Sequence, residues 1–165
     1  MEQYELSADI NATAQSCYRL FRNFSAMPSY MENIKEMKEL RQNVWRWVLI
    51  GEKGDESTWE MLLEHDIPEK MLVLRTLSGP EIEMSLEVDF QDLRPGVSRI
   101  TLNMVILTVE FGVGKLLLGL FGVSRTRLEG NLQHFKAKIE SMEAEKAGRG
   151  ETRPEKVEES PSVAN

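Results

Sequence analysis

Histidine, cysteine and tyrosine, whose side chains often do acid–base or nucleophilic chemistry, are few in this chain of 165 residues, which contains two histidines, one cysteine and three tyrosines. His65 is the candidate acid or base, because it follows Met61 and Leu63 at the two-residue spacing of one face of a strand. The alternative is a histidine at a strand end, close to water. Tyr30 either brings a hydroxyl to a pocket edge or anchors a short helix. His65 and Tyr30 are therefore the catalytic candidates.

The second histidine and the single cysteine are not expected to take part in catalysis unless the thiol is reactive. His134 lies on the flank of a predicted helix, where we expect solvent exposure. Cys17 lies on the apolar face of another predicted helix and is either a small buried core residue or a reactive thiol. With one cysteine and two histidines the sequence lacks zinc-site spacing, so we expect no metal.

The glycine-rich segment 111–122, FGVGKLLLGLFG, does not fit a phosphate-binding loop. A Walker pattern requires glycine and then serine or threonine where the sequence has Val109 and Leu116, and a dinucleotide pattern fails at its third glycine. No cofactor is expected. The segment is either a loop or short helix that closes the core, or a flap over the mouth of a pocket.

Composition narrows the class of protein. A net charge of −7 with scattered basic residues argues against nucleic acid as a partner. Hydrophobic residues at 41% and charged residues at 28% are typical of a globular protein. Because no apolar run reaches about 18 residues, and the start has no leader pattern, we expect a cytoplasmic protein without stable membrane insertion.

Hydrophobic spacing predicts the elements that position these groups. Residues 4–10 alternate as a strand with one wet face, residues 12–23 form a helix capped by Asn11, and a second short helix follows Ser25. Turn residues at 42–43, 51–54, 68–70, 78–80 and 94–96 then separate six strands. These connections are too short for parallel crossovers, so neighbouring strands are antiparallel.

The last long apolar segment, residues 124–142, is predicted to be a one-sided helix. Leu128, Leu132, Phe135, Ile139 and Met142 recur at steps of four and three, so they form one stripe. The stripe requires a broad apolar partner, which the sheet supplies. Residues 1–145 are predicted to form one ligand-binding domain, and the charged residues 146–165 a disordered tail.

These elements predict an α+β fold in which a curved, seven-stranded antiparallel sheet grips the long C-terminal helix, with two short helices after the first strand. One helix is too narrow to fill the concave side of a twisted sheet, so a cavity is expected between them. In the ambiguous run 71–75, Leu72 and Leu74 are assigned inward and Arg75 outward. The candidate ligand-binding residues are Trp47, Trp59, Met61, Leu63, Leu74, Val88, Leu102, Met104, Leu117, Leu128, Leu132 and Phe135.

Three stretches occur in a recognisable order: INATAQSCYRLFRNFSAMPSYMENI, RWVLIGEKGDESTWEMLLEHDIPEKMLVLRT and NLQHFKAKIE. Over residues 3–143 the sequence resembles the START-like or SRPBCC superfamily, in particular its polyketide cyclase/dehydrase branch. The resemblance rests on the order and spacing of all three stretches. It implies a helix-grip fold that binds a hydrophobic small molecule.

Three functions remain open at this stage. The first is a noncatalytic binder or carrier of an apolar molecule such as a lipid, isoprenoid quinone or polyketide-like aromatic. The second is a polyketide aromatase/cyclase or dehydratase, which needs His65 or Tyr30 in the pocket. The third is a fully packed regulatory or partner-binding module, in which the tryptophans fill the chamber. Trp47 and Trp59 are accordingly either core residues or part of a ligand platform.

Overall fold

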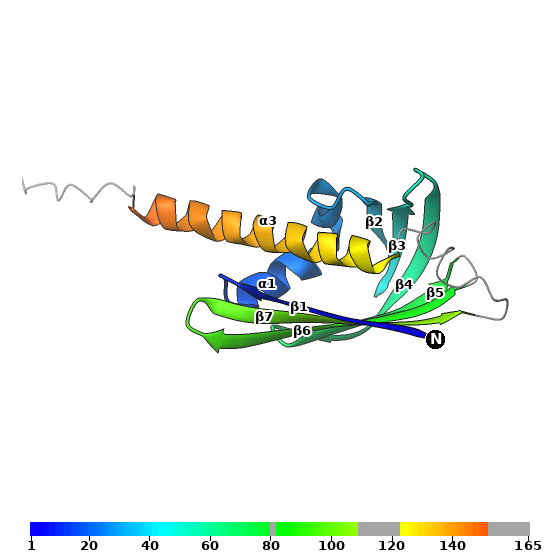
Figure 1. The fold of residues 1–165 in the computed structure, drawn as a ribbon, viewed down its shortest axis with the longest axis horizontal. Helices are drawn as coiled ribbons and strands as arrows, with labels where there is room; N and C mark the ends of the chain where they lie inside the picture. Colours follow the sequence, from blue (N-terminus) through cyan, green and yellow to red (C-terminus); the bar gives the residue numbers. More distant parts are fainter. Residues whose placement is uncertain (80–81, 109–122, 152–165) are drawn as a thin grey trace, which may run out of the picture.

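A computed structural model describes residues 1–79, 82–108 and 123–151 (Figure 1). Its elements are β1 (Glu2–Ile10), α1 (Ala14–Arg22), the 3₁₀ helix η1 (Phe24–Ser29), β2 (Ile34–Arg41), β3 (Val44–Ile50), β4 (Glu56–Ile67), β5 (Met71–Ser78), β6 (Ile82–Arg94), β7 (Val97–Thr108) and α3 (Arg125–Glu151). The predicted helix-grip fold is confirmed: seven strands, two short helices after the first, and a long helix at the C-terminal side.

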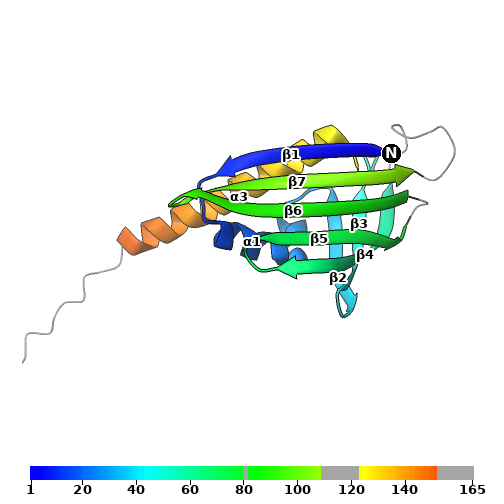
Figure 2. The same cartoon turned by 90° about the horizontal axis from the view of Figure 1, so that it is seen from below.

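The strands form one antiparallel sheet in the order β1-β7-β6-β5-β4-β3-β2, which leaves β1 and β2 as its outer strands (Figure 2). Few residues separate each consecutive pair of strands from β2 to β7, and all these pairs are antiparallel, as predicted. Asn43, Glu69 and Gly96 adopt positive φ angles of 62°, 66° and 77° in three of these turns. The β2–β3 pairing is shifted in register between Ile34 and Glu36 and again between Glu39 and Arg41.

Alternation along the strands gives the sheet a buried and a wet face. In β6, for example, Met84, Leu86 and Val88 are buried, whereas the intervening residues are more exposed. The ambiguous strand β5 follows the predicted assignment, with Leu72 and Leu74 fully buried. The buried face is concave. Figure 1 shows β2, β3 and β4 rising beside the first turns of α3, while β1, β7 and β6 run beneath it.

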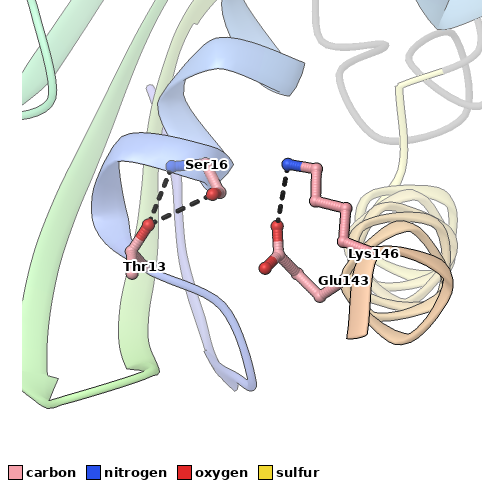
Figure 3. Close-up of polar contacts among 4 residues, drawn as sticks. All are labelled: Thr13, Ser16, Glu143 and Lys146. Carbon is pink, nitrogen blue, oxygen red and sulfur yellow. Dashed lines mark hydrogen bonds and ion pairs between the residues drawn. The ribbon is translucent and has the colours of Figure 1, made fainter. Parts of the chain in front are cut away.

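Helix α1 begins two residues later than the predicted start at residue 12. Thr13, not Asn11, is its N-cap, and the Thr13 hydroxyl accepts from the backbone N–H of Ser16 at 3.1 Å (Figure 3). Asn11 instead donates its backbone N–H to Glu140 of α3 at 3.1 Å. Helix α1 packs on β6, β7 and α3, and thereby closes one end of the concave side.

Helix α3 carries the predicted stripe on its inner face. Leu132, Phe135 and Ile139 are buried, and Leu128 and Met142 pack on the core from its margins. The helix continues past Met142 to Glu151 and extends beyond the end of the sheet (Figure 1). Residues 146–151 are therefore helical rather than part of the predicted tail. Lysine, alanine, arginine and glutamate in this stretch favour helix, whereas its two glycines oppose it.

A Glu143–Lys146 ion pair one turn apart adds local support to this extension (Figure 3). The rest of the predicted tail, residues 152–165, lies outside the described residues. The glycine-rich segment 111–122, with its two interpretations as closing loop or flap, also lies outside them.

Candidate ligand-binding site

The concave side of the sheet and α3 enclose a cavity of about 90 Å³. Strands β1, β3, β6 and β7 line one side and α3 lines the other, while α1, η1 and the segment before β2 close one end. The described residues of its wall are Tyr4, Leu6, Phe21, Met27, Met31, Asn33, Ile34, Trp47, Leu49, Met84, Leu86, Leu102, Met104, Val123, Leu128, Asn131, Leu132 and Phe135.

The wall is almost entirely apolar, and methionine is prominent in it. Met27, Met31, Met84 and Met104 all line the cavity. An apolar cavity of about 150 Å³ holds a benzene ring, so the void of about 90 Å³ is smaller than a cavity known to accept one aromatic ring. Methionine is unbranched and flexible, and it adapts to irregular shapes. These side chains are therefore the part of the wall best able to change shape.

Ionisable chemistry is sparse on this wall. Among its described residues none is a carboxylic acid, histidine, cysteine, lysine or arginine, and the one titratable group is Tyr4. Burial, and then the hydrogen bond that the Tyr4 hydroxyl donates to Glu2 at 2.5 Å, raises the pKa of Tyr4 to about 12. At neutral pH this hydroxyl stays protonated and already has an acceptor, so it is a poor general base.

Two buried polar atoms on the wall have no hydrogen-bond partner within the described ranges: Asn33 Oδ1 and Trp47 Nε1. Asn33 is 6% exposed and Trp47 is 7% exposed. An unpaired buried donor or acceptor costs about 1–3 kcal/mol, so native proteins rarely keep one without a reason. Such atoms mark a place where a bound molecule can form the missing hydrogen bonds.

An open groove of about 360 Å³ adjoins the cavity on its outer side. Its described lining is Glu32, Asn33, Glu52, Thr126, Arg127, Gly130, Asn131 and His134. Asn33 and Asn131 line both the groove and the cavity. Asn33 and Asn131 therefore lie between the groove and the apolar interior, near the start of β2 and in the first turns of α3.

Residues 1–140 match the family named "Polyketide cyclase / dehydrase and lipid transport". The match spans most of the chain and includes the whole sheet and the first half of α3. This chain belongs to the polyketide cyclase/dehydrase and lipid transport family. The resemblance seen in the sequence is thereby confirmed. No curated protein matches the sequence significantly.

Solved structures of similar fold span nearly the same length. A START superfamily protein from Mycobacterium smegmatis has 13% identity and a TM-score of 0.67, with 88% of this chain and 98% of that chain covered. The Zhui aromatase/cyclase from a Streptomyces species has 18% identity and a TM-score of 0.60, with 90% and 94% covered. A protein from Deinococcus radiodurans has 20% identity and a TM-score of 0.64, with 86% and 99% covered. At these identities the likeness concerns the fold.

Half of the predicted ligand-binding residues lie on the wall of this family cavity. They are Trp47, Leu102, Met104, Leu128, Leu132 and Phe135. Trp59, Met61, Leu63, Leu74 and Val88 are on the predicted buried face but pack within the core, outside the described wall. Leu117 lies outside the described residues. That any of these side chains binds a ligand stays a prediction.

The two tryptophans that were candidates for a ligand platform differ in their polar atom. Trp59 is fully buried, and its Nε1 donates to the Ser57 hydroxyl at 2.9 Å. Trp47 lies on the cavity wall, and its ring packs edge-on against Phe24 at 6.1 Å. Its Nε1 has no hydrogen-bond partner in the described part of the chain. Trp59 is therefore a core residue in this structure, whereas Trp47 faces the cavity.

The inward placement of His65 is wrong. The β4–β5 pairing shifts register between Leu63 and His65, so His65 leaves the inward face and is exposed. The neighbouring Asp66 accepts hydrogen bonds from Tyr18 and from Arg22, the latter at 2.9 Å, which ties this end of β4 to α1. His65 therefore does not reach the cavity.

Tyr30 is half-buried and packs against Phe135, but it is not part of the described cavity wall. Its hydroxyl is buried without a partner in the part of the chain that the structure describes, and burial raises its pKa. His134 is exposed, as expected, at the edge of the outer groove. Cys17 is fully buried, and burial raises the pKa of its thiol to about 11, which favours the core interpretation.

Several wall residues were missing from the prediction. Leu6, Leu49 and Leu86 continue the inward alternation of their strands, so the pattern contained their signal. Met27 and Met31 belong to the Met-Pro segment, whose position against the sheet is a tertiary feature. Asn33 had no signal, because a buried asparagine between a helix and a strand looks like an ordinary loop residue.

Neither a metal site nor a membrane span emerges from the described ranges. In residues 1–79, 82–108 and 123–151 no three His, Cys, Asp or Glu side chains gather in a way that suits a metal ion. None of the helices in those ranges is both long and apolar enough to cross a bilayer.

Proposed function

We propose that this protein binds or carries an apolar small molecule in the cavity between the sheet and α3, drawn from the class of lipids, isoprenoid quinones and polyketide-like aromatics. The observation that carries this proposal is the wall itself. It combines aliphatic and aromatic side chains with four methionines and, in its described part, offers no charged group. Such a surface favours apolar ligands through burial of area, at roughly 25 cal/mol per Å².

The groove supports a route for exchange. It meets the cavity at Asn33 and Asn131, so a ligand can pass between β2 and α3 without separating the strands of the sheet. The small size of the cavity implies that the wall expands as the ligand enters. The methionines on opposite sides of the void, Met31 before β2 and Met104 on β7, are suited to that expansion.

The alternative, a polyketide aromatase/cyclase or dehydratase, receives less support from the geometry. Ring closure requires a group that moves protons near neutral pH and a donor that stabilises an enolate. Of the two candidates, His65 is exposed and Tyr30 lies off the described wall. Conversion of a poly-ketone by the wild-type protein would favour this alternative.

Native mass spectrometry of protein purified from its own host tests the binding function directly. We expect an additional mass that disappears on denaturation, together with saturable binding of the neutral probe N-phenylnaphthylamine. If the protein retains no molecule and binds no apolar probe, the proposal is wrong and the packed-module hypothesis is favoured.

A matched pair of variants locates the binding. Leu102→Phe adds volume at a buried wall position of β7, and overpacking costs about 1–3 kcal/mol, so probe affinity should fall by about tenfold or more. Leu107→Phe makes the same change on the same strand at a side chain that is 46% exposed, and should leave affinity unchanged. Equal effects of both variants would place the probe elsewhere.

A further inference from the structure

We infer that the ligand of this cavity is a neutral apolar molecule carrying a hydroxyl group, and that Asn33 and Trp47 bind that hydroxyl. This inference rests on the proposed function and names the chemical class of the ligand. Its basis is a pair of buried polar atoms on a mostly apolar wall, one an acceptor and the other a donor, neither of which has a partner among the described residues.

The two side chains lie on neighbouring parts of one hairpin. The backbone carbonyl of Asn33 accepts from the backbone N–H of Ile50 at 2.8 Å, and the next residue, Ile34, pairs with Leu49. Trp47 precedes Leu49 by two positions on β3, roughly 7 Å away along the strand, and lines the same cavity. Both side chains therefore line the void from the β2–β3 corner, and the inference places their two polar atoms on the ligand.

The chemistry of the two atoms selects the ligand group. Asn33 Oδ1 accepts a hydrogen bond, and the indole Nε1–H of Trp47 donates one. A hydroxyl oxygen both donates and accepts, so an alcohol or phenol satisfies both side chains, whereas a ketone or ether satisfies only Trp47. A carboxylate is disfavoured, because the described wall contains no cation to pair with it.

The position of Asn33 also orients the ligand. Asn33 lines both the cavity and the outer groove, so the hydroxyl lies where the cavity adjoins this groove. The apolar body of the ligand then extends inward, toward the leucines and methionines of β6 and β7. A molecule oriented in this way enters with its apolar end first.

Phenol and toluene test this inference, because they have nearly the same shape and differ in the hydroxyl. We expect phenol to bind despite its greater affinity for water. We also expect Trp47→Phe and, separately, Asn33→Leu to lower the ratio of phenol affinity to toluene affinity by about threefold to tenfold, the value of one hydrogen bond. The ratio is the readout because it cancels changes in cavity shape that affect both probes.

Trp45→Phe is the matched control. Trp45 lies on the same strand, is also 7% exposed and also has an unpartnered Nε1, but it is not part of the described cavity wall. This variant should leave the ratio unchanged. In wild-type protein the indole N–H signal of Trp47 should shift downfield with phenol and not with toluene.

The outcomes separate the two proposals. If both probes bind and the ratio is the same in wild type, Trp47→Phe and Asn33→Leu, the hydroxyl inference is wrong while the apolar cavity stands. If neither probe binds the wild type, the proposed function fails and the inference fails with it.

Discussion

Truncation of Leu132 probes the contact between α3 and the sheet at the cavity. Leu132 is 5% exposed and lies on the wall, whereas Ile139, two turns later on the same stripe, is 1% exposed and lies away from it. Leucine and isoleucine are isomers, so Leu132→Ala and Ile139→Ala remove the same number of carbon atoms. A difference in stability loss between the two variants therefore reports on the packing around each side chain rather than on the number of atoms removed.

The expected costs follow from burial and from the existing void. Loss of the Leu132 side chain beyond Cβ forfeits about 0.8 kcal/mol for each buried carbon, or about 2–3 kcal/mol in total. One side of Leu132 already borders empty space, so fewer packing contacts are lost there. Ile139 is packed on all sides, and its truncation opens a new cavity, so we expect about 3–5 kcal/mol.

Urea denaturation at 25 °C, followed by tryptophan fluorescence, measures both values by linear extrapolation. A second measurement uses the enlarged cavity: Leu132→Ala should bind benzene more tightly than the wild type, whereas Ile139→Ala should not. A loss below about 0.5 kcal/mol for Leu132→Ala would mean that α3 does not pack on the sheet as described. A larger loss for Leu132→Ala than for Ile139→Ala would contradict the presence of the void.

Three other predictions follow from individual side chains. Burial, with hydrogen bonds to Glu2 and Asp66 respectively, raises the pKa values of Tyr4 and Tyr18 to about 12. Above their ordinary pKa near 10 the unfolded chain loses these protons and the folded protein keeps them. Stability measured in urea should therefore be unaffected by these groups below about pH 10 and fall as the pH rises toward 12, with a shallower fall in Tyr18→Phe. Cys17, which is fully buried with a thiol pKa of about 11, should react with aromatic disulfides only in proportion to the unfolded fraction, and rapid labelling in native buffer would show that it is accessible. Gly130 lies inside α3 with open space around the position of a β-carbon, so Gly130→Ala should stabilise the protein by about 0.5–1 kcal/mol, and a loss of stability on urea denaturation would contradict the open surroundings.

The sequence predicts the fold well because polar and apolar residues alternate along the strands and turn-forming residues separate them. Period-two alternation assigned even the ambiguous Leu72 and Leu74 to the buried side, as the structure confirms. Alternation fails where the backbone inserts a residue. The register shift before His65 reverses the face of every later residue in β4. No residue type in this part of β4 predicts the shift.

The cavity wall is harder to predict than the buried face. Alternation determines which side of the sheet a residue occupies, but not whether it meets a void or another side chain. Val88 and Leu102 are paired neighbours on β6 and β7, and yet only Leu102 lines the cavity. The difference depends on where α1 and α3 lie over the sheet, which is a property of the assembled chain.

The open order of the sheet leaves β2 as an outer strand, where another chain can add by backbone pairing. This strand carries Lys35, Lys38 and Arg41 at exposed positions, and its two register shifts interrupt a regular ladder. An incoming strand would meet charged side chains and mismatched hydrogen-bonding groups. Both features disfavour backbone pairing at this edge, even though the concave side behind it is strongly apolar.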